Sequence, residues 1–353
     1  MNSQLSTKLI ALAFMLNAVS FQSRVLAEET VTGPLASKLT ATPPALAAGG
    51  ASAREINAKM KSGEIQVLKP VTDLPPGVEA SFDVEFGKGG TKPLLLDLFK
   101  PKEIKRPVPI LIFVHGGAWR EGSRKNYGIY CRDFARKGFV VATIEYRLSG
   151  EAPFPAAIQD VKCAIRWVRA NAARLGGDPN KIGLVGGSAG GHLVLLAAYA
   201  SNDPELEGMG GNNDVSSRVQ AVVDIYGLVS LGGPGPSPGR SMFINVRNPD
   251  PLLRFMGGKT WEDDRAFYEK ASPITHLTKN APPTLILHGT IDELVNIKHG
   301  DRLAAKLSEL GVPYLYDRIE GWHHGMDGVK EVHDHCEWMM DQFFAQVLPL
   351  PTQ

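Results

Sequence analysis

The pentapeptide GGSAG at residues 186–190 constrains this chain more than any other feature of its sequence. It follows an apolar segment, IGLV at 182–185, and precedes a helical one, HLVLLAAYA at 192–200. Glycines on both sides of Ser188 permit a sharp turn from strand to helix, which raises the serine hydroxyl above the carboxyl end of the strand. This context predicts a nucleophile at Ser188, and a glycine-rich packing turn is the alternative. A dinucleotide-binding loop is excluded because the glycines lack the GxGxxG spacing.

Short apolar segments alternate with segments of helical periodicity along most of the chain. The apolar segments predict strands that are buried on both faces, at residues 109–116, 139–146, 181–187, 219–227, 282–289 and 314–321. The periodic segments predict helices at residues 155–176, 299–311 and 329–347. Strands and helices in this alternation indicate an α/β fold, with a mostly parallel sheet covered by helices on both faces. We expect one such domain, from residue 70 to residue 350.

One segment departs from this alternation. Residues 231–243, LGGPGPSPGRSMF, are dense in glycine and proline and carry no period, so they predict a loop. Together with the residues that follow, they form an insertion at 230–270 between two strands. Insertions over a sheet edge often cap a pocket, so we expect this one to influence the choice of substrate.

Residues 1–27 have the pattern of a secretory signal peptide. Lys8 precedes an apolar run at 9–19, and Ala27 ends a stretch that suits signal peptidase. The run is far shorter than the ~20 residues that span a bilayer, so no integral membrane span is predicted. We expect cleavage after Ala27 and a secreted or periplasmic protein. An uncleaved membrane-surface anchor is the alternative, because Arg24 interrupts the cleavage region.

Residues 28–69 are rich in alanine, threonine, proline and glycine and contain few large apolar side chains. We interpret them as a linker or a loosely docked arm that precedes the main domain.

The composition narrows the class of partner. The chain has 38 basic and 37 acidic residues among 353, which gives no basic field for nucleic acid and favours a neutral or small partner. Cys131, Cys163 and Cys336 are too few and too scattered for a disulfide framework, although one bridge is possible. Cys163 lies in a helical apolar pattern and is expected to be a small buried side chain.

A second motif, HGGAW at residues 115–119, ends the strand predicted at 109–116. Adjacent glycines let backbone N–H groups turn outward, as an oxyanion-binding site requires. We expect Gly117, Ala118 and, after the serine, Ala189 to supply these donors. A tight strand-to-loop turn is the alternative. His115 is expected to hold the loop by hydrogen bonding.

A serine nucleophile needs a base and an acid that orients the base, and after a turn of this kind the two follow in the order acid, then histidine. Asp292 comes just after the strand predicted at 282–289, with Glu293 as its neighbouring rival. His323 and His324 both come after the last predicted strand. We favour His324, because Gly325 beside it suits a loop that places imidazole over the serine.

Histidine and tryptophan residues suggest two further kinds of site. His323, His324, His333, His335 and Cys336 are close in sequence, but their spacing fits no zinc motif, so no metal is predicted. The indole rings could form a carbohydrate-stacking surface or belong to the core, and they are Trp119, Trp322 and Trp338.

The motifs together resemble the α/β-hydrolase superfamily. The sequence is most similar to secreted bacterial carboxylesterases of the feruloyl- and acetyl-xylan-esterase-like branch, which is related to hormone-sensitive lipase. The resemblance covers about residues 80–348 and rests on these segments: HGGAWREGS, YRLS, FPAAIQDV, GGDPNKIGLVGGSAGGHL, ASPITHL, APPTLILHGTIDELV and EGWHHG. It implies an eight-stranded, mostly parallel sheet, no cofactor, and a triad in which Ser188 is nucleophile, Asp292 acid and His324 base.

Two positions depart from the family pattern. Trp322 and His323 stand where relatives usually have small residues before the catalytic histidine, and Ala118 replaces the third glycine of the HGGG pattern. We therefore expect Trp119 and Trp322 to shape the mouth of the site and contact substrate.

The resemblance implies a serine esterase that acts on carboxylic esters, with short-chain acyl or carbohydrate-linked acetyl or feruloyl groups. Three other classes stay open at this point. One is an amidase, formamidase-like or peptidase-like serine hydrolase, and another is a non-catalytic binding protein with a hydrolase fold. The third is a zinc protein, which metal analysis of the purified chain would distinguish.

Overall fold

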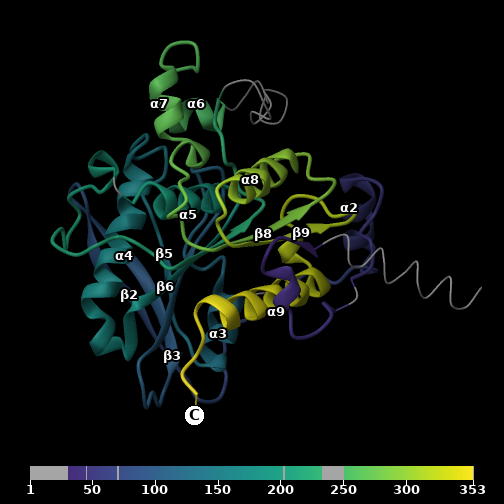
Figure 1. The fold of residues 1–353 in the computed structure, drawn as a ribbon, viewed down its shortest axis with the longest axis horizontal. Coiled ribbons are helices and arrows are strands. Elements are labelled where there is room, and N and C mark those ends of the chain that lie inside the picture. The colour runs from purple at the N-terminus through teal and green to yellow at the C-terminus, as the bar shows by residue number, and fades with distance from the viewer. Residues whose placement is uncertain (1–30, 45, 70, 202, 233–249, 353) are drawn as a thin grey trace, which may run out of the picture.

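A computed structural model describes residues 31–44, 46–69, 71–201, 203–232 and 250–352 of the chain, and these residues form one α/β unit around a single sheet (Figure 1). The strands are β1 (Val31–Thr32), β2 (Val78–Gly89), β3 (Lys92–Pro101), β4 (Val108–Val114), β5 (Val140–Ile144), β6 (Gly177–Gly187), β7 (Ala221–Ile225), β8 (Thr284–Gly289) and β9 (Tyr314–Ile319). The α-helices are α2 (Ala53–Ser62), α3 (Gly128–Lys137), α4 (Ala156–Leu175), α5 (Ala189–Tyr199), α6 (Pro251–Phe255), α7 (Arg265–Lys270), α8 (Lys298–Glu309) and α9 (Lys330–Val347). Short 3₁₀ helices are η1 (Ala36–Lys38), η2 (Pro204–Leu206), η3 (Pro273–Thr275) and η4 (Met326–Gly328).

The sheet has the order β1-β9-β8-β7-β6-β4-β5-β3-β2. Strands β4 to β9 are parallel to their neighbours among themselves, while β2, β3 and β1 pair antiparallel at the two edges. The six strands predicted from apolar segments are β4 to β9, and the mostly parallel α/β architecture is confirmed. The resemblance implied eight strands, whereas the sheet has nine, because the two-residue β1 adds to its β9 edge.

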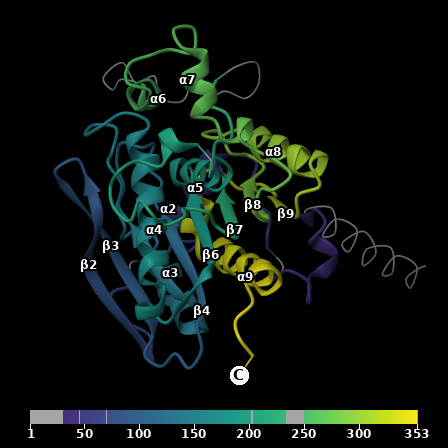
Figure 2. The same cartoon turned by 60° about the vertical axis from the view of Figure 1, so that its left-hand side comes forward.

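The parallel strands are buried on both faces, as their sequences predicted. In β4, Ile110 and Ile112 pack into one core cluster, whereas Leu111 and Phe113 pack into the other. This alternation follows from the two-residue period of a strand. Helices α4, α5 and α8 contribute to the first cluster, and α3 and α9 contribute to the second (Figure 2). The carboxyl ends of the strands therefore emerge between two helical layers, where loops can carry functional side chains.

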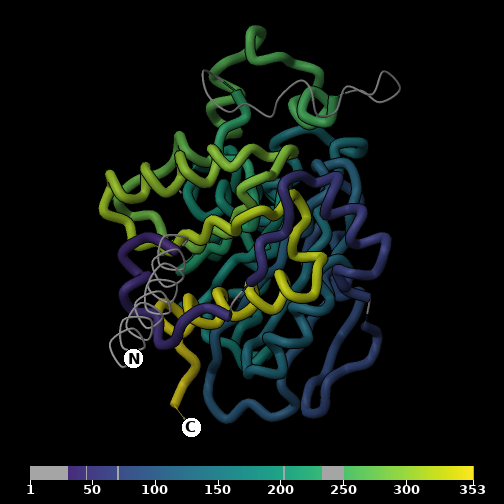
Figure 3. Tube along the Cα trace, turned by 90° about the vertical axis from the view of Figure 1, so that its right-hand side faces the viewer, coloured from purple at the N-terminus to yellow at the C-terminus, as the bar shows by residue number. Residues whose placement is uncertain are grey.

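The N-terminal arm is packed more closely than a linker would be. Leu35 and Ile56 are buried in the core cluster that contains α9. Further along, the Leu68 N–H donates to the Gly328 carbonyl at 2.9 Å, and Val67 forms an isolated bridge with Val329. Figure 3 shows the N-terminal arm, in purple, lying along α9, in yellow. The arm contains few large apolar residues, and two of them, Leu35 and Ile56, anchor it to the domain, whereas Val67 is 46% exposed.

The predicted insertion is described only in part. Residues 233–249, and the predicted signal peptide at 1–27, lie outside the described residues. Within the insertion, α6 and α7 lie above α5 in Figure 1. Phe255 of α6 is buried and joins the main core. This part of the insertion is therefore fixed to the domain by apolar packing.

The paired state of the cysteines and the hydropathy of the helices can both be read from the structure. Cys131, Cys163 and Cys336 are all free and buried, so no disulfide forms between them. Cys163 is a buried side chain of α4, as its helical pattern predicted. None of the helices in the described ranges has both the length and the hydropathy that a bilayer crossing requires.

Candidate active site

Ser188 lies on the turn between β6 and α5, in a backbone conformation that L-residues rarely adopt. Its φ is 57° and its ψ is −122°. The turn is tight: a Cβ on Gly190 would come within 2.1 Å of the Val114 carbonyl oxygen, and one on Gly186 within 2.5 Å of Gly190. Strain of this kind costs about 1–3 kcal/mol and persists only where neighbouring structure imposes it. Here the Ser188 N–H donates to the Ile225 carbonyl at 2.9 Å, which fixes the turn to β7.

Three side chains form a hydrogen-bonded chain at this turn. His324 Nε2 lies 2.9 Å from Ser188 Oγ, and His324 Nδ1 lies 2.7 Å from Asp292 Oδ2. Because a carboxylate only accepts, Nδ1 carries the proton in the neutral ring and Nε2 can accept the serine proton. Asp292 follows β8 and His324 follows β9, so the parallel sheet brings three loops to one edge.

The environment keeps Asp292 ionised. Its Oδ1 accepts hydrogen bonds from the N–H groups of Leu294 and Val295, at 2.8 and 2.7 Å. Burial acts to raise the pKa of Asp292, but interactions with His288 and His324 outweigh it and hold the pKa below its ordinary value. A buried, ionised carboxylate fixes the ring orientation and stabilises the imidazolium when it forms.

The two rival residues take no part in this chain. Glu293 is exposed, and His323 is buried with its Nδ1 lacking a hydrogen-bond partner among the described residues. The structure thus brings together the acid and the histidine that the sequence favoured.

The loop after β4 faces the same space. Gly117 and Ala118, with Ala189 at the first position of α5, line one cavity together with Ser188. Gly117 has φ 109°, and a Cβ there would come within 2.1 Å of the Glu121 carbonyl oxygen. Ala118 has φ 51°, a conformation that costs an alanine about 1–2 kcal/mol. The strained positions, Gly117 and Ala118, therefore lie within the HGGAW motif that the sequence analysis singled out.

His115 lies behind this loop and is absent from the residues that line the cavity. Its Nδ1 is 2.7 Å from the Gly116 carbonyl oxygen, and its ring stacks on Tyr146 with centroids 4.3 Å apart. Burial lowers the pKa of His115 to about 4, although the hydrogen bond with Gly116 acts in the opposite direction. The ring is therefore neutral near pH 7 and supports the loop.

The two tryptophans that we expected to contact substrate have different positions. Trp119 lines the cavity, stacks on Phe255 with centroids 4.5 Å apart, and donates from Nε1 to His192 at 3.2 Å. Trp322 is only 1% exposed, donates from Nε1 to the Ala47 carbonyl, and lies outside the cavity lining. The prediction that Trp322 contacts substrate is therefore wrong, because the arm covers its ring.

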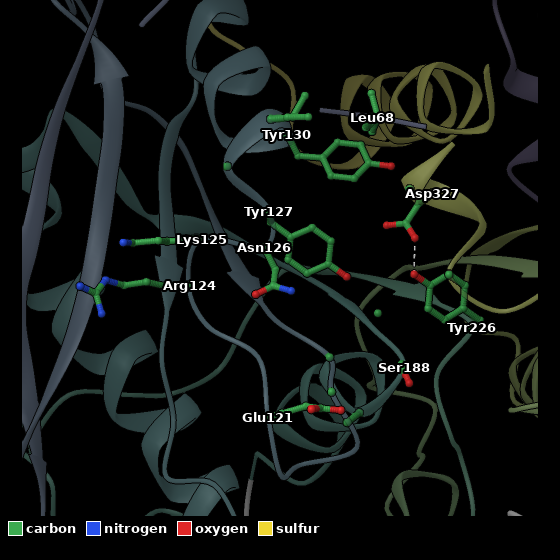
Figure 4. Close-up of a pocket in the computed structure, with 18 of the residues that line it drawn as sticks. Leu68, Glu121, Arg124, Lys125, Asn126, Tyr127, Tyr130, Ser188, Tyr226 and Asp327 are labelled. Atoms are coloured by element: carbon green, nitrogen blue, oxygen red, sulfur yellow. Dashed lines mark hydrogen bonds between the residues drawn. The ribbon is translucent and has the colours of Figure 1, made fainter. Parts of the chain in front are cut away.

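The cavity at Ser188 has a volume of about 1330 Å³ and is lined in part by residues that the sequence analysis did not single out. Tyr127 and Tyr130 come from the start of α3, Tyr226 follows β7, and Asp327 belongs to η4. In Figure 4 Tyr127, Tyr226 and Asp327 lie on one side of Ser188, and Tyr130 lies beyond them. Tyr226 and Asp327 each had one signal in the sequence. Tyr226 lies near the end of the strand predicted at 219–227, and Asp327 comes three residues after the favoured histidine. The tyrosines of α3 had none.

A metal could be held at one place among the residues that the structure describes. Ligand atoms of Asp133, His333 and Glu337 lie within 4.8 Å of one another. Lys137 Nζ lies 2.6 Å from Glu337 Oε1, so this carboxylate already has a cationic partner. Of the other residues considered for zinc, His335 Nε2 lies 2.6 Å from Asp317 Oδ2. The histidine cluster of the sequence is therefore dispersed in the fold.

Comparison with known proteins places the chain in a family. The sequence model of the BD-FAE family matches residues 96–307, more than half of the 353 residues. The chain belongs to the BD-FAE family. The predicted α/β-hydrolase fold and the resemblance to carboxylesterases related to hormone-sensitive lipase are thereby confirmed.

Two relatives come from Mycobacterium tuberculosis. Esterase LipC is 38% identical over 240 residues, which cover 66% of this chain and 57% of LipC. The probable carboxylic ester hydrolase LipM is 30% identical over 308 residues, which cover 85% of this chain and 66% of LipM. This BD-FAE family chain thus matches less than two thirds of the length of either relative.

Two solved structures are similar over most of the chain. A truncated carbohydrate esterase from gut microbiota has a TM-score of 0.62 and 27% identity, and the match covers 75% of this chain and 96% of that one. Esterase Est2 of Thermogutta terrifontis, solved with propionate bound, has a TM-score of 0.63 and 27% identity, and the match covers 79% of this chain and 97% of that one.

Proposed function

We propose that this BD-FAE family chain is a serine esterase that hydrolyses carboxylic esters through an acyl-enzyme on Ser188. The observation that carries the proposal is the hydrogen-bonded chain from Asp292 through His324 to Ser188, which opens into a large cavity. The names of the relatives, esterase and carboxylic ester hydrolase, also support it.

The chemistry follows from the geometry of the three residues. Ser188 Oγ attacks the ester carbonyl carbon while His324 Nε2 takes the hydroxyl proton, and Asp292 stabilises the imidazolium. His324 then gives this proton to the leaving alcohol oxygen as the ester C–O bond breaks. Water, deprotonated by His324, attacks the acyl-enzyme, and Ser188 recovers its proton when the acid leaves.

The oxyanion of each tetrahedral intermediate would be bound at the loop after β4 and the start of α5. Gly117, Ala118 and Ala189 are the proposed N–H donors, and the amino end of α5 adds a favourable dipole. Removing one donor from such a site costs about 10²–10³ in rate.

For the substrate we propose short-chain acyl esters or carbohydrate-linked acetyl or feruloyl esters. Support comes from a carbohydrate esterase and a propionate-bound esterase among the similar structures. Trp119, in the cavity wall, is the tryptophan that we propose to contact the substrate. The proposed partner is therefore a small ester or a polysaccharide that carries one.

The proposed location and domain limits rest on the sequence pattern. We propose that residues 1–27 are a signal peptide removed after Ala27, that the mature protein is secreted or periplasmic, and that the catalytic domain spans 70–350. Sequencing the N-terminus of the protein exported by its producing cells would test the cleavage site, and an unprocessed Met1 would contradict it.

The direct test of the function is hydrolysis of p-nitrophenyl acetate, butyrate and octanoate by the purified chain, with Ser188→Ala beside it. We expect turnover that falls with acyl length, and a loss of at least about 10³-fold in the variant. A folded wild-type chain without turnover of any ester would contradict the proposal. Amide turnover would then favour the amidase alternative, and no turnover at all would favour a binding protein.

A further inference from the structure

One part of the cavity wall combines tyrosine hydroxyls with a carboxylate and an imidazole. We call this part the inner compartment, and it consists of Tyr127, Tyr130, Tyr226, Asp327 and His333. The lining of the same cavity also contains apolar side chains, among them Leu228, Leu252, Leu294 and Val295. In Figure 4 the hydroxyls of Tyr127 and Tyr226 and the Asp327 carboxylate converge on one region beside Ser188.

The inner compartment is joined directly to the proposed base. The Tyr226 ring packs against the His324 ring, with centroids 4.5 Å apart. The Tyr226 hydroxyl donates to Asp327 Oδ1, and Asp327 comes three residues after His324. On the far side, Tyr130 stacks on His333 with centroids 3.9 Å apart. A group bound here would thus lie next to the reacting ester.

Two members of the compartment have unused hydrogen-bonding capacity. Tyr130 is 2% exposed and His333 is 3% exposed. Within the described part of the chain, the Tyr130 hydroxyl and both ring nitrogens of His333 have no hydrogen-bond partner, although His333 Nε2 lies 3.9 Å from Glu337 Oε2. A buried polar atom without a partner costs about 1–3 kcal/mol, so three such atoms at one place call for a ligand that satisfies them.

Charge indicates which kind of ligand fits. Burial lowers the pKa of His333, although nearby carboxylates including Glu337 act to raise it, and the ring is therefore neutral. A neutral imidazole and a phenol each both donate and accept, whereas the Asp327 carboxylate, when ionised, only accepts. Burial raises the pKa of Asp327, although its hydrogen bond with Tyr226 acts in the opposite direction. None of the five side chains of the inner compartment is cationic, so the compartment offers an anionic ligand no counter-charge. An aliphatic chain would leave the unpaired atoms unpaired. A hydroxyl group, which both donates and accepts, matches all of them.

We propose that the inner compartment binds a hydroxyl-bearing part of the ester substrate. Tyr130, Asp327 and His333 form hydrogen bonds with its hydroxyl groups. The proposal rests on the proposed function of Ser188 as the reacting residue. The hydroxyl groups can belong to the leaving alcohol or to the acyl group of the ester, because both kinds donate and accept hydrogen bonds. The test therefore includes both.

The test measures binding without turnover. Calorimetry on the Ser188→Ala chain compares two matched pairs of esters, and within each pair only one member carries ring hydroxyls. The first pair is a methyl pentopyranoside monoacetate and cyclohexyl acetate, for the alcohol half. The second is ethyl quinate and ethyl cyclohexanecarboxylate, for the acyl half. We expect the hydroxylated ester of at least one pair to bind about tenfold more tightly than its partner.

The second arm adds Tyr130→Phe to the Ser188→Ala chain. This variant removes one oxygen that has no partner in the described structure, so the fold is expected to stay intact. The preference for the hydroxylated ester should fall by about five- to tenfold. Asp327→Asn should also reduce it. Tyr199→Phe is the matched control, since Tyr199 is buried against Thr284 outside this cavity, and it should keep the preference.

The outcomes separate the two proposals. A preference in the first pair assigns the compartment to the alcohol half, and one in the second pair assigns it to the acyl half. No preference in either pair overturns the proposal, as does a preference that both Tyr130→Phe and Asp327→Asn leave within twofold of the parent. Because Ser188→Ala binds without reacting, these results can be read even if the wild-type chain hydrolyses no ester.

Discussion

At the scale of single residues, the two carboxylate oxygens of Asp292 have different hydrogen-bond partners. Oδ1 is held by the N–H groups of Leu294 and Val295, which fix the carboxylate to its own turn. Oδ2 faces His324 Nδ1 at 2.7 Å and is also 3.5 Å from His288 Nε2. The side chain is therefore oriented before any substrate arrives, as an acid that only positions the base should be.

Replacement of this acid should be far more damaging than replacement of its neighbour. Asp292→Asn keeps the size of the side chain but presents an amide that cannot fix the required tautomer, so we expect kcat to fall by about 10⁴-fold. Glu293→Gln is the matched control and should stay within about twofold, because Glu293 is exposed. Steady-state kinetics on both variants would check this, and equal losses would show that the acid has been wrongly assigned.

The sequence predicted the residues that meet at Ser188 because each follows a strand with a strong local pattern. Ser188, Asp292 and His324 each come directly after an apolar segment, and parallel strands end at one edge. Trp322 was misplaced because its local pattern does not reveal that a segment some 270 residues earlier covers it, through Ala47. Tyr130 was missed for a similar reason, since the local sequence around it does not show that this part of α3 lines the cavity.

At the scale of elements, the N-terminal arm forms part of the cavity. Val67, Leu68 and Lys69 are among the lining residues, and the arm is held beside η4 by the hydrogen bond from the Leu68 N–H to the Gly328 carbonyl. The composition of the arm, which has few large apolar side chains, gave no indication of this role, because only scattered apolar residues anchor it. The antiparallel β2 and β3 were hidden in a similar way, since β2 has many exposed residues and does not read as a buried strand.

Removing one anchor of the arm should destabilise the protein. Ile56 of α2 is fully buried, so we expect Ile56→Ala to lower the free energy of unfolding by about 2–5 kcal/mol. Ile65 is only partly buried, and Ile65→Ala should cost less. Urea denaturation of the two variants would check the difference. If both variants matched the parent chain, the arm could not be a packed part of the domain.

At the scale of the whole molecule, the doubly covered parallel sheet explains why the site lies where it does. Strands β4, β6, β8 and β9 each end in a loop that supplies one proposed part of the mechanism. Asp250 and Leu252, from the described part of the insertion, and residues of the arm then add to the cavity wall from outside the sheet. The pattern of apolar segments in the sequence predicted the parallel sheet. The walls of the cavity depend on tertiary packing, which the periodicity of the sequence does not describe.

The central claim is that Ser188 is an activated nucleophile, and covalent labelling tests it most directly. The purified chain would be treated with a fluorophosphonate and digested, and the labelled peptide identified by mass spectrometry, with His324→Ala as a control for activation. We expect one adduct, on Ser188, that forms far more slowly in the control. An unlabelled protein, or an adduct on another residue with Ser188 unmodified, would contradict the account.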